Sequence, residues 1–347
     1  MEGTAQTALV VGGGPAGIEA AIKIGVCGHR AVLVEREQEL GGYLRGLARL
    51  FPSRVDPGAL LQATLAQLQR LPTVSVMTGS QVSTIQRQGP AFVARIERGD
   101  APAVSVDAGA LVLATGFDYF DVSRYGEYGH GFYPGVVNSL EFESLLARWA
   151  AGQGLAEAPA AVAFFKCVGS RDRAKGHPFC SKICCLYTAK QAAMFKELFP
   201  SGKAFVFYMD VRAAGKGCEE FVRDAIEDKG VRYIRGRPAK VLPEGPRLQI
   251  RAEDTLIGTP IEAEVDMVVL AGAAVPRPET RRLCAMLEVR TDEYGFLQSE
   301  PGQPVVAGEG VFFAGGCGFP ADLQQVQEQG AAAAAEVVAR FASRAQR

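Results

Sequence analysis

Four of the eight cysteines of this chain lie between residues 167 and 185, in the segment KCVGSRDRAKGHPFCSKICC. Cys167, Cys180, Cys184 and Cys185 follow the spacing C-x12-C-x3-C-C, which ends in two adjacent thiols. Cysteine thiolates bind metals and exchange disulfides, so thiols at this density indicate a metal centre or a redox site.

The spacing of these cysteines discriminates between four kinds of site. A structural zinc site commonly uses two C-x2–4-C pairs, and neighbouring cysteines strain tetrahedral coordination of one ion. The C-x-x-C dithiol of thioredoxin-like proteins occurs nowhere in the chain. Packing in the core explains one or two buried thiols more easily than four. An iron–sulfur cluster presents several irons, so adjacent cysteines can each bind a different one. The spacing therefore favours a cluster, with zinc and core packing as alternatives.

A glycine-rich turn near the start of the chain indicates a second kind of chemistry. The segment TALVVGGGPAGIEAAIKIGVCGHRAVLVERE, residues 7–37, predicts a strand, a turn, a helix and a second strand. Gly12, Gly14 and Gly17 have the G-x-G-x-x-G spacing of a dinucleotide-binding turn, and Glu35 ends the second strand. The glycines would let a pyrophosphate approach the helix N-terminus, whose dipole favours an anion, and Glu35 would accept hydrogen bonds from ribose hydroxyls.

Two later segments resemble the other FAD-contacting segments of flavoproteins of the thioredoxin reductase type. Residues 111–121 run from a strand into Ala114-Thr115-Gly116, and residues 310–341 read as a strand, a glycine turn and a long alanine-rich helix. That family commonly has Gly-Asp at the second turn, whereas Cys317 follows Gly316 here. The resemblance implies FAD, and the expected contacts are Gly12, Gly14, Pro15, Ala16, Gly17, Glu35, Arg36, Gly42, Ala114, Thr115, Gly116, Gly315, Gly316 and Asp322.

The same resemblance implies an α/β fold with two Rossmann-like domains, the second inserted into the first. We expect a discontinuous FAD-binding domain at residues 1–157 and 263–347 and an inserted α/β domain at 158–262. Within the insert, the pattern predicts strands at 161–166, 203–209 and 231–234 and helices at about 182–199 and 217–229. A pyridine-nucleotide domain would have its own glycine-rich turn after the first of these strands, but this chain has Cys167 and the following cysteines there.

The composition is that of an ordinary globular enzyme. It is 48% hydrophobic and 22% charged with a net charge of −1, which gives no electrostatic reason to expect a nucleic-acid partner. We find no basic and apolar leader and no apolar run of the roughly 18 residues that a membrane span needs. We therefore expect a cytoplasmic protein, in which clustered cysteines indicate metal or redox use rather than disulfides.

Longer motifs resemble one particular family. The segments KCVGSRD…FCSKICCLYTAKQA, FYMDVRAAGKGCEEFVRDA and GVRYIRGRPAKV are similar to the A subunit of heterodisulfide reductases, as are GFYPGVVNSLEFESLL and AGGCGFPADLQQVQEQG. Members of that family bind FAD and a 4Fe–4S cluster, and the resemblance implies Cys167, Cys180, Cys184 and Cys185 as the cluster ligands. Electrons would pass singly between cluster and flavin and on to partner subunits.

The chain departs from the longer methanogen members, because it starts at the first FAD strand and contains no ferredoxin motif. It therefore resembles the short form in the heterodisulfide-reductase-like complex of sulfur oxidisers. That resemblance implies partner subunits of the B and C types, and we expect a homodimer when the chain is isolated. The alternatives are the A subunit of the quinone-interacting complex of sulfate reducers, a stand-alone NAD(P)H:disulfide oxidoreductase, and a zinc-stabilised scaffold.

Lys190 follows the cysteines on the same predicted helix and shares its mainly apolar face with Tyr187 and Met194. One expectation is that the ammonium extends to solvent along that face. The other, favoured by the resemblance, is a catalytic role in which Lys190 reaches the flavin N5 region and stabilises reduced, anionic flavin. The cysteines outside the cluster motif are expected to be packing residues: Cys27, Cys218, Cys284 and Cys317.

Overall fold

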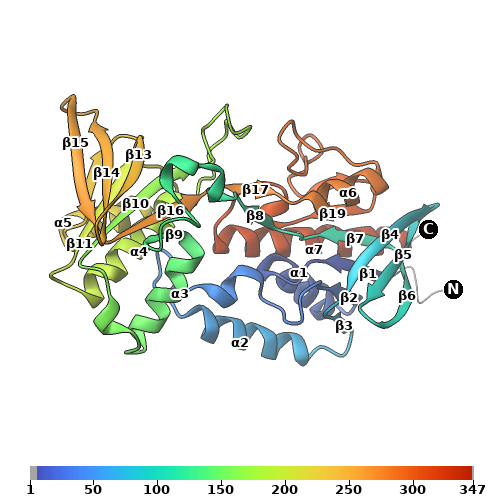
Figure 1. Cartoon of the computed structure of the whole chain (residues 1–347). Helices are drawn as coiled ribbons and strands as arrows, with labels where there is room; N and C mark the ends of the chain where they lie inside the picture. Colours follow the sequence, from blue (N-terminus) through green and yellow to red (C-terminus); the bar gives the residue numbers. More distant parts are fainter. Residues whose placement is uncertain (1–5, 346–347) are drawn as a thin grey trace. The chain divides into compact units, whose positions relative to one another are not determined.

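The computed structural model describes residues 6–345, which form two compact units (Figure 1). Unit 1 contains the described residues up to Arg45, Gly58–Asp118 and the described residues from Pro276 onward, and unit 2 contains Gly46–Pro57 and Tyr119–Val275. Each unit has a mainly parallel sheet with helices on one face and a three-stranded antiparallel sheet on the other. Among the described residues, we find no helix with the length and apolar character needed to cross a membrane.

The main sheet of unit 1 has the strand order β18-β19-β7-β1-β2-β3. Its strands are β1 (Thr7–Val11), β2 (Arg30–Val34), β3 (Val74–Met77), β7 (Ala110–Leu113), β18 (Val306–Gly308) and β19 (Val311–Phe313). All neighbouring pairs are parallel except β18 and β19. One face packs on α1 (Pro15–Val26), α2 (Pro57–Gln69) and α7 (Leu323–Ala345), and the other on α6 (Pro278–Leu287) and the sheet of β4 (Gln81–Gln88), β5 (Ala91–Arg98) and β6 (Ala101–Ala108).

The continuous apolar run of β1 follows from this layering. Ala8 and Val10 belong to the core shared with the helices, whereas Leu9 and Val11 belong to the core on the opposite face. Successive side chains of a strand point to opposite faces, so a central strand covered on both sides needs an apolar residue at every position.

Unit 2 repeats this layering with the strand order β12-β11-β10-β16-β9, in which all pairs are parallel. The strands are β9 (Val136–Asn138), β10 (Ala161–Val168), β11 (Lys203–Tyr208), β12 (Arg232–Arg235) and β16 (Met267–Gly272). One face packs on α3 (Ser139–Ala150), α4 (Cys184–Leu198) and α5 (Cys218–Glu227), and the other on β13 (Lys240–Glu244), β14 (Arg247–Asp254) and β15 (Thr259–Val265). The short strands β8 (Phe117–Tyr119) and β17 (Ala274–Pro276) pair where the chain passes between the units.

The elements predicted around the cysteines are confirmed, because β10, α4, β11, α5 and β12 occur in the expected order and near the expected bounds. The limits of unit 2 differ from the expected insert at 158–262, since the unit begins at Tyr119, ends at Val275 and includes Gly46–Pro57. The physical reason is long-range pairing: β9 aligns with β16 through Val136↔Val268 and Leu270↔Asn138, which brings β9 and the helix after it into the second sheet.

Candidate functional site

The glycine turn between β1 and α1 leaves space where a pyrophosphate would lie. A Cβ atom on Gly12, whose φ is 110°, would lie 2.2 Å from the carbonyl oxygen of Ala114, and one on Gly17 would lie 1.9 Å from the carbonyl oxygen of Gly12. A Cβ on Gly14 would meet nothing within 4 Å, and Gly14 caps α1 without a side-chain hydrogen bond. The first and third glycines are thus required by the fold itself, and the second borders open space at a helix N-terminus, which fits a dinucleotide phosphate.

Two backbone N–H groups hold Glu35 against this turn. Its side chain is buried, one carboxylate oxygen accepts a hydrogen bond from the Gly13 N–H at 2.6 Å, and the other accepts from the Glu37 N–H at 2.9 Å. The next residue, Arg36, pairs with carboxylates of Glu37 at 3.3 Å and Glu279 at 3.8 Å. The carboxylate of Glu35 is therefore fixed beside the turn, while its contact to a ribose stays a prediction.

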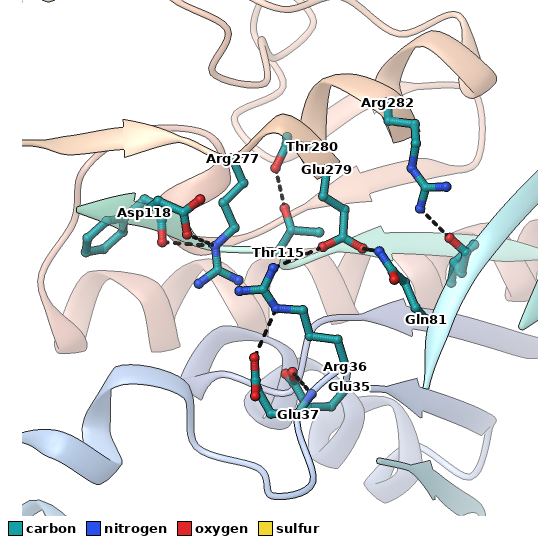
Figure 2. Close-up of polar contacts among 12 residues, drawn as sticks. Glu35, Arg36, Glu37, Gln81, Thr115, Asp118, Arg277, Glu279, Thr280 and Arg282 are labelled. Carbon is teal, nitrogen blue, oxygen red and sulfur yellow. Dashed lines mark hydrogen bonds and ion pairs between the residues drawn. The ribbon is translucent and has the colours of Figure 1, made fainter. Parts of the chain in front are cut away.

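The first turn of α6 is tied to the end of β7 (Figure 2). The buried hydroxyls of Thr115 and Thr280 are hydrogen-bonded at 2.7 Å. Arg277, the N-cap of α6, donates to the carbonyl oxygen of Phe117 at 3.0 Å and pairs with Asp118 at 2.8 Å. These contacts fix the segment Ala114-Thr115-Gly116, in which Gly116 has a φ of 75°.

The remaining FAD candidates also lie in unit 1, around the glycine turn and the start of α7. A Cβ on Gly42 would lie 3.4 Å from Gly14 Cα. The Gly315 N–H donates to Gln329 Oε1 at 2.7 Å, and a Cβ on Gly315 would lie 3.0 Å from the side chain of Ala16. The other three candidates sit beside these: Pro15 at the first position of α1, Gly316 in the short 3-10 turn Gly315–Cys317, and Asp322, whose carboxylate accepts from the Gln325 N–H at 3.0 Å.

Cys317 replaces the acidic residue that the flavoprotein pattern has after Gly316. Its side chain is completely buried, and its thiol donates to the carbonyl oxygens of Leu113 at 3.2 Å and Ala314 at 3.3 Å. Burial raises the pKa of the Cys317 thiol to about 11. A neutral thiol with backbone partners is a packing residue, which agrees with the expectation for this position.

In unit 2, the cysteine motif occupies the loop between the carboxyl end of β10 and the N-terminus of α4. The pairing of β10 with β16 is irregular between Phe165 and Val168, and Cys167 has a φ of 60°. Arg171 and Lys182, with φ of 57° and 59°, have the same left-handed backbone. Such conformations are unfavourable for residues with a Cβ and gather at functional sites, so the loop is shaped for the position of its side chains.

Three of the four thiols influence one another's protonation. Interaction with Cys167 and Cys185 raises the pKa of Cys184. Interaction with Cys184 lowers the pKa of Cys167 to about 7 and that of Cys185 to about 5. The fourth cysteine, Cys180, has its Sγ within 3.3 Å of the Lys182 N–H, from which it accepts a hydrogen bond.

The chemistry of this loop fits an anionic, sulfur-containing group. The Arg212 N–H donates to Cys185 Sγ at 3.3 Å, and such backbone donors stabilise thiolates. The fully buried hydroxyls of Ser170 and Thr188 have no hydrogen-bond partner among the described residues, so both can donate to a bound acceptor. Within residues 6–345, no three or more His, Cys, Asp or Glu side chains are grouped to hold a metal ion as they stand.

Lys190 is buried in unit 2, and its ammonium does not reach solvent. Its Nζ lies 2.5 Å from Glu143 Oε1 and donates to the carbonyl oxygen of Arg49 at 2.8 Å. Burial lowers the pKa of Lys190, while Glu143 opposes that shift. The expectation of an ammonium extended to solvent is therefore wrong, because a carboxylate on α3 holds it, and the flavin role stays a prediction.

Three residues of these sites were not predicted from the sequence. Lys166 could have been recognised, because it is the one charged residue in the otherwise apolar strand AVAFFKCV. Thr280 and Glu143 leave no local signal, because their partners Thr115 and Lys190 are far away in sequence.

Comparison with known proteins relates the chain to oxidoreductases. Residues 6–143 match the pyridine nucleotide-disulphide oxidoreductase family. The chain is 30% identical to an iron-sulfur A subunit of the CoB–CoM heterodisulfide reductase of Methanopyrus kandleri, over 97% of this chain and 64% of that protein. It is 29% identical to the A subunit of a ferredoxin/F420H2-dependent CoB–CoM heterodisulfide reductase of Methanosarcina acetivorans, over 96% of this chain and 53% of that protein. The chain thus spans less than two thirds of the length of these relatives.

The solved structures with a similar fold include several reductases. Thioredoxin reductase from T. acidophilum superposes with a TM-score of 0.66 at 16% identity, covering 96% of this chain and 98% of that one. A NAD-dependent persulfide reductase from A. fulgidus superposes with a TM-score of 0.61 at 18% identity, covering 95% of this chain and 59% of that one. These likenesses confirm the predicted fold of two Rossmann-like domains of the thioredoxin reductase type.

Proposed function

Because this chain is a homologue of the A subunits of heterodisulfide reductases over nearly its whole length, we propose that it is a flavin- and iron–sulfur-containing electron-transfer subunit. The proposed cofactors are FAD in unit 1 and a 4Fe–4S cluster at Cys167, Cys180, Cys184 and Cys185 in unit 2. The proposed setting is a heterodisulfide-reductase-like complex in the cytoplasm of a sulfur oxidiser.

One observation carries the proposal. The crossover after the first central strand of unit 2 is the position where a Rossmann domain binds a dinucleotide pyrophosphate, and here that crossover contains the cysteine motif. The equivalent crossover of unit 1 keeps an open glycine turn. One unit is therefore suited to a dinucleotide and the other to a group bound by thiolates.

The residues of each unit have separate tasks in this proposal. When bound, FAD and the cluster supply electron transfer, the flavin in one- or two-electron steps and the cluster in single steps. In unit 1, Gly14 leaves room for phosphate, the α1 N-terminus attracts it, and Glu35 orients the ribose. In unit 2, the cysteines bind iron, and the N–H groups of Lys182 and Arg212 donate to sulfur.

Lys190 is the proposed catalytic residue, with its ammonium near the flavin N5 region. The ion pair with Glu143 supports this proposal, because a nearby carboxylate keeps a buried lysine charged. Replacement of Lys190 by Met removes the charge and should lower the midpoint potential of the flavin with little effect on iron content. An unchanged flavin potential in this variant would reject the catalytic role.

The proposal is tested by anaerobic purification followed by cofactor analysis. We expect about one FAD and about four iron atoms per chain on the 4Fe–4S proposal. Zinc in place of iron would reject the electron-transfer proposal in favour of a zinc-stabilised scaffold that retains FAD.

The rival function is a stand-alone NAD(P)H:disulfide oxidoreductase. It is disfavoured because unit 2 has cysteines in place of a glycine turn and the chain contains no C-x-x-C pair. Rapid bleaching of the flavin by NADH or NADPH in a stopped-flow experiment would restore this rival, whereas slow or absent bleaching supports the proposal.

The proposed partners are B- and C-type subunits, with a homodimer as the isolated form. The relatives are named as A subunits of reductases, and these names support an assembly with further subunits. The quinone-interacting complex of sulfate reducers remains the alternative assembly. Identification of the subunits that co-purify anaerobically, together with turnover of sulfur compounds, distinguishes the two.

A further inference from the structure

Strand β10 contains a buried charge that the proposed ligand set does not include. Its sequence is AVAFFKCV, every residue of the strand is buried, and Lys166 is 6% exposed. A fully covered central strand is normally apolar throughout, and lysine is rarely buried unless it is paired. Lys166 therefore needs an anionic partner.

The contacts of Lys166 include no carboxylate. Its Nζ donates to the main-chain carbonyl oxygen of Asp210 at 3.1 Å and lies 5.4 Å from the centroid of the Tyr208 ring. Among the described residues, the ion pairs within 4.0 Å do not include Lys166, and the Asp210 carboxylate pairs with Arg171 at 2.6 Å and Arg212 at 3.5 Å. The carboxylate of the residue whose main-chain oxygen binds Lys166 is thus paired with two arginines.

Cys185 lies beside the same carbonyl group. Its Sγ is 4.0 Å from the carbonyl oxygen of Asp210, the atom to which Lys166 donates. The Lys166 ammonium and the Cys185 thiol therefore lie beside the same oxygen atom. The irregular pairing between Phe165 and Val168 explains how Lys166 and Cys167, neighbours in the strand, both reach this group of thiols, because a bulge interrupts the alternation of side chains.

We propose that Lys166 is the charge-compensating residue of the cysteine site, and that its buried ammonium stabilises negative charge gained at the Cys185 side of the site. This inference rests on the proposed iron–sulfur function. A fixed positive charge favours the more negative, reduced state, so Lys166 raises the potential of the one-electron reduction. Lys166 transfers neither the electron nor a proton, and it acts on the site only through its positive charge.

The test is a redox titration of the whole, anaerobically purified chain, in which dithionite supplies the electron and EPR reports the reduced cluster. Lys166→Gln removes the charge, Lys166→Arg keeps it, and Arg223→Gln removes an exposed arginine of α5 that has no part in the cysteine loop. We expect Lys166→Gln to decrease the equilibrium constant for reduction at least tenfold, which corresponds to about 59 mV for one electron. The other two variants should stay within about threefold of the unmodified chain, since solvent screens the exposed arginine.

Each outcome decides the matter, with FAD content serving as the check that unit 1 is intact. Loss of iron in Lys166→Gln with retention in Lys166→Arg would support the inference, because arginine keeps the positive charge and glutamine does not. Loss of iron in both variants would overturn it and give Lys166 a purely structural role. Full iron content with an unchanged midpoint in Lys166→Gln would also overturn it. Absence of iron from the unmodified chain would instead reject the proposed function.

Discussion

The two units use the same crossover in opposite ways. In unit 1, Gly12–Gly14 alone separate β1 from α1, and the turn contributes backbone and empty space. In unit 2, residues 169–183 separate β10 from α4, and the loop with the strand and helix ends contributes thiols. The sheet and the helix N-terminus are equivalent in both, so the loop alone determines which kind of group each unit can hold.

The positive-φ residues differ between these loops for a physical reason. Gly12, with a φ of 110°, adopts its conformation at little cost because it has no Cβ. Cys167, Arg171 and Lys182 adopt left-handed conformations although each has a Cβ. A turn that binds phosphate needs residues without side chains, so that the ligand can approach the backbone. A thiolate site needs side chains directed to one point, and the unfavourable backbone conformations that direct them are maintained by the surrounding contacts.

Replacement of both Cys184 and Cys185 by Ser is expected to have the largest effect. If these residues bind different irons, the double variant loses the EPR signal of the cluster completely, while the flavin absorbance of unit 1 remains because its contacts come from other segments. Anaerobic EPR and absorbance spectra measure both. Loss of FAD together with iron would show that the two loops are not independent.

Replacement of Glu35 tests the dinucleotide loop. Charge-assisted hydrogen bonds contribute roughly 1.5–3 kcal/mol each, so Glu35→Ala should weaken FAD binding by about 10- to 150-fold. Glu35→Gln should weaken it less, because the amide oxygen can still accept from the Gly13 N–H that the carboxylate binds at 2.6 Å. Titration of apoprotein with FAD measures the affinity, and equal affinity in all three proteins would exclude a ribose contact.

Gly14→Ala separates the needs of the fold from those of the ligand. A Cβ at Gly14 meets nothing within 4 Å, so the melting temperature of the FAD-free protein should fall only slightly, through the loss of a favoured N-cap residue. With FAD present, the methyl group would crowd the pyrophosphate, and overpacking of about 1–3 kcal/mol corresponds to roughly 5- to 150-fold weaker binding. Gly12→Ala is the matched control, because its Cβ would lie 2.2 Å from a carbonyl oxygen and should destabilise even the FAD-free protein.

The smallest expected effect concerns acid stability of the cysteine loop. The Asp172 carboxylate accepts from the Tyr125 hydroxyl at 2.5 Å and pairs with Arg237 at 2.8 Å, and the Tyr125 oxygen accepts from the Gly169 N–H at 3.3 Å. These contacts lower the pKa of Asp172 from 3.8 to about 2, and the hydrogen bond from Tyr125 makes the largest contribution. The folded value is the lower one, so this stabilisation is fully present above about pH 4 and is lost as the pH falls towards 2.

Asp172→Asn should therefore reduce the decline in stability of unit 2 between these pH values, and it should leave unit 1 unchanged. Urea unfolding monitored at several pH values measures this difference. An identical pH dependence in the variant would show that Asp172 does not stabilise the loop.

The strands and helices that flank both loops could be predicted because the sequence patterns that indicate them are local. Alternation of apolar strands and helices identified β1-α1-β2 and β10-α4-β11-α5-β12, and the G-x-G-x-x-G spacing identified the turn. The structure also explains why the turn requires glycine. A Cβ atom on Gly17, for example, would lie 1.9 Å from a carbonyl oxygen. The limits of unit 2 were not predictable, because β9 joins β16 across more than 100 residues and its three residues give no hint of their partner.

By itself, the sequence determined the layout of two α/β units, the glycine turn in one and the four cysteines in the other. Only the tertiary structure decided how individual side chains are used. Lys190 pairs with Glu143 on α3, Thr280 reaches Thr115, and Lys166 is buried beside Cys185 without a carboxylate. Local patterns specify the backbone because they depend on neighbours in the chain, whereas the charge and hydrogen-bond partners of a buried group depend on which distant segments the fold packs against it.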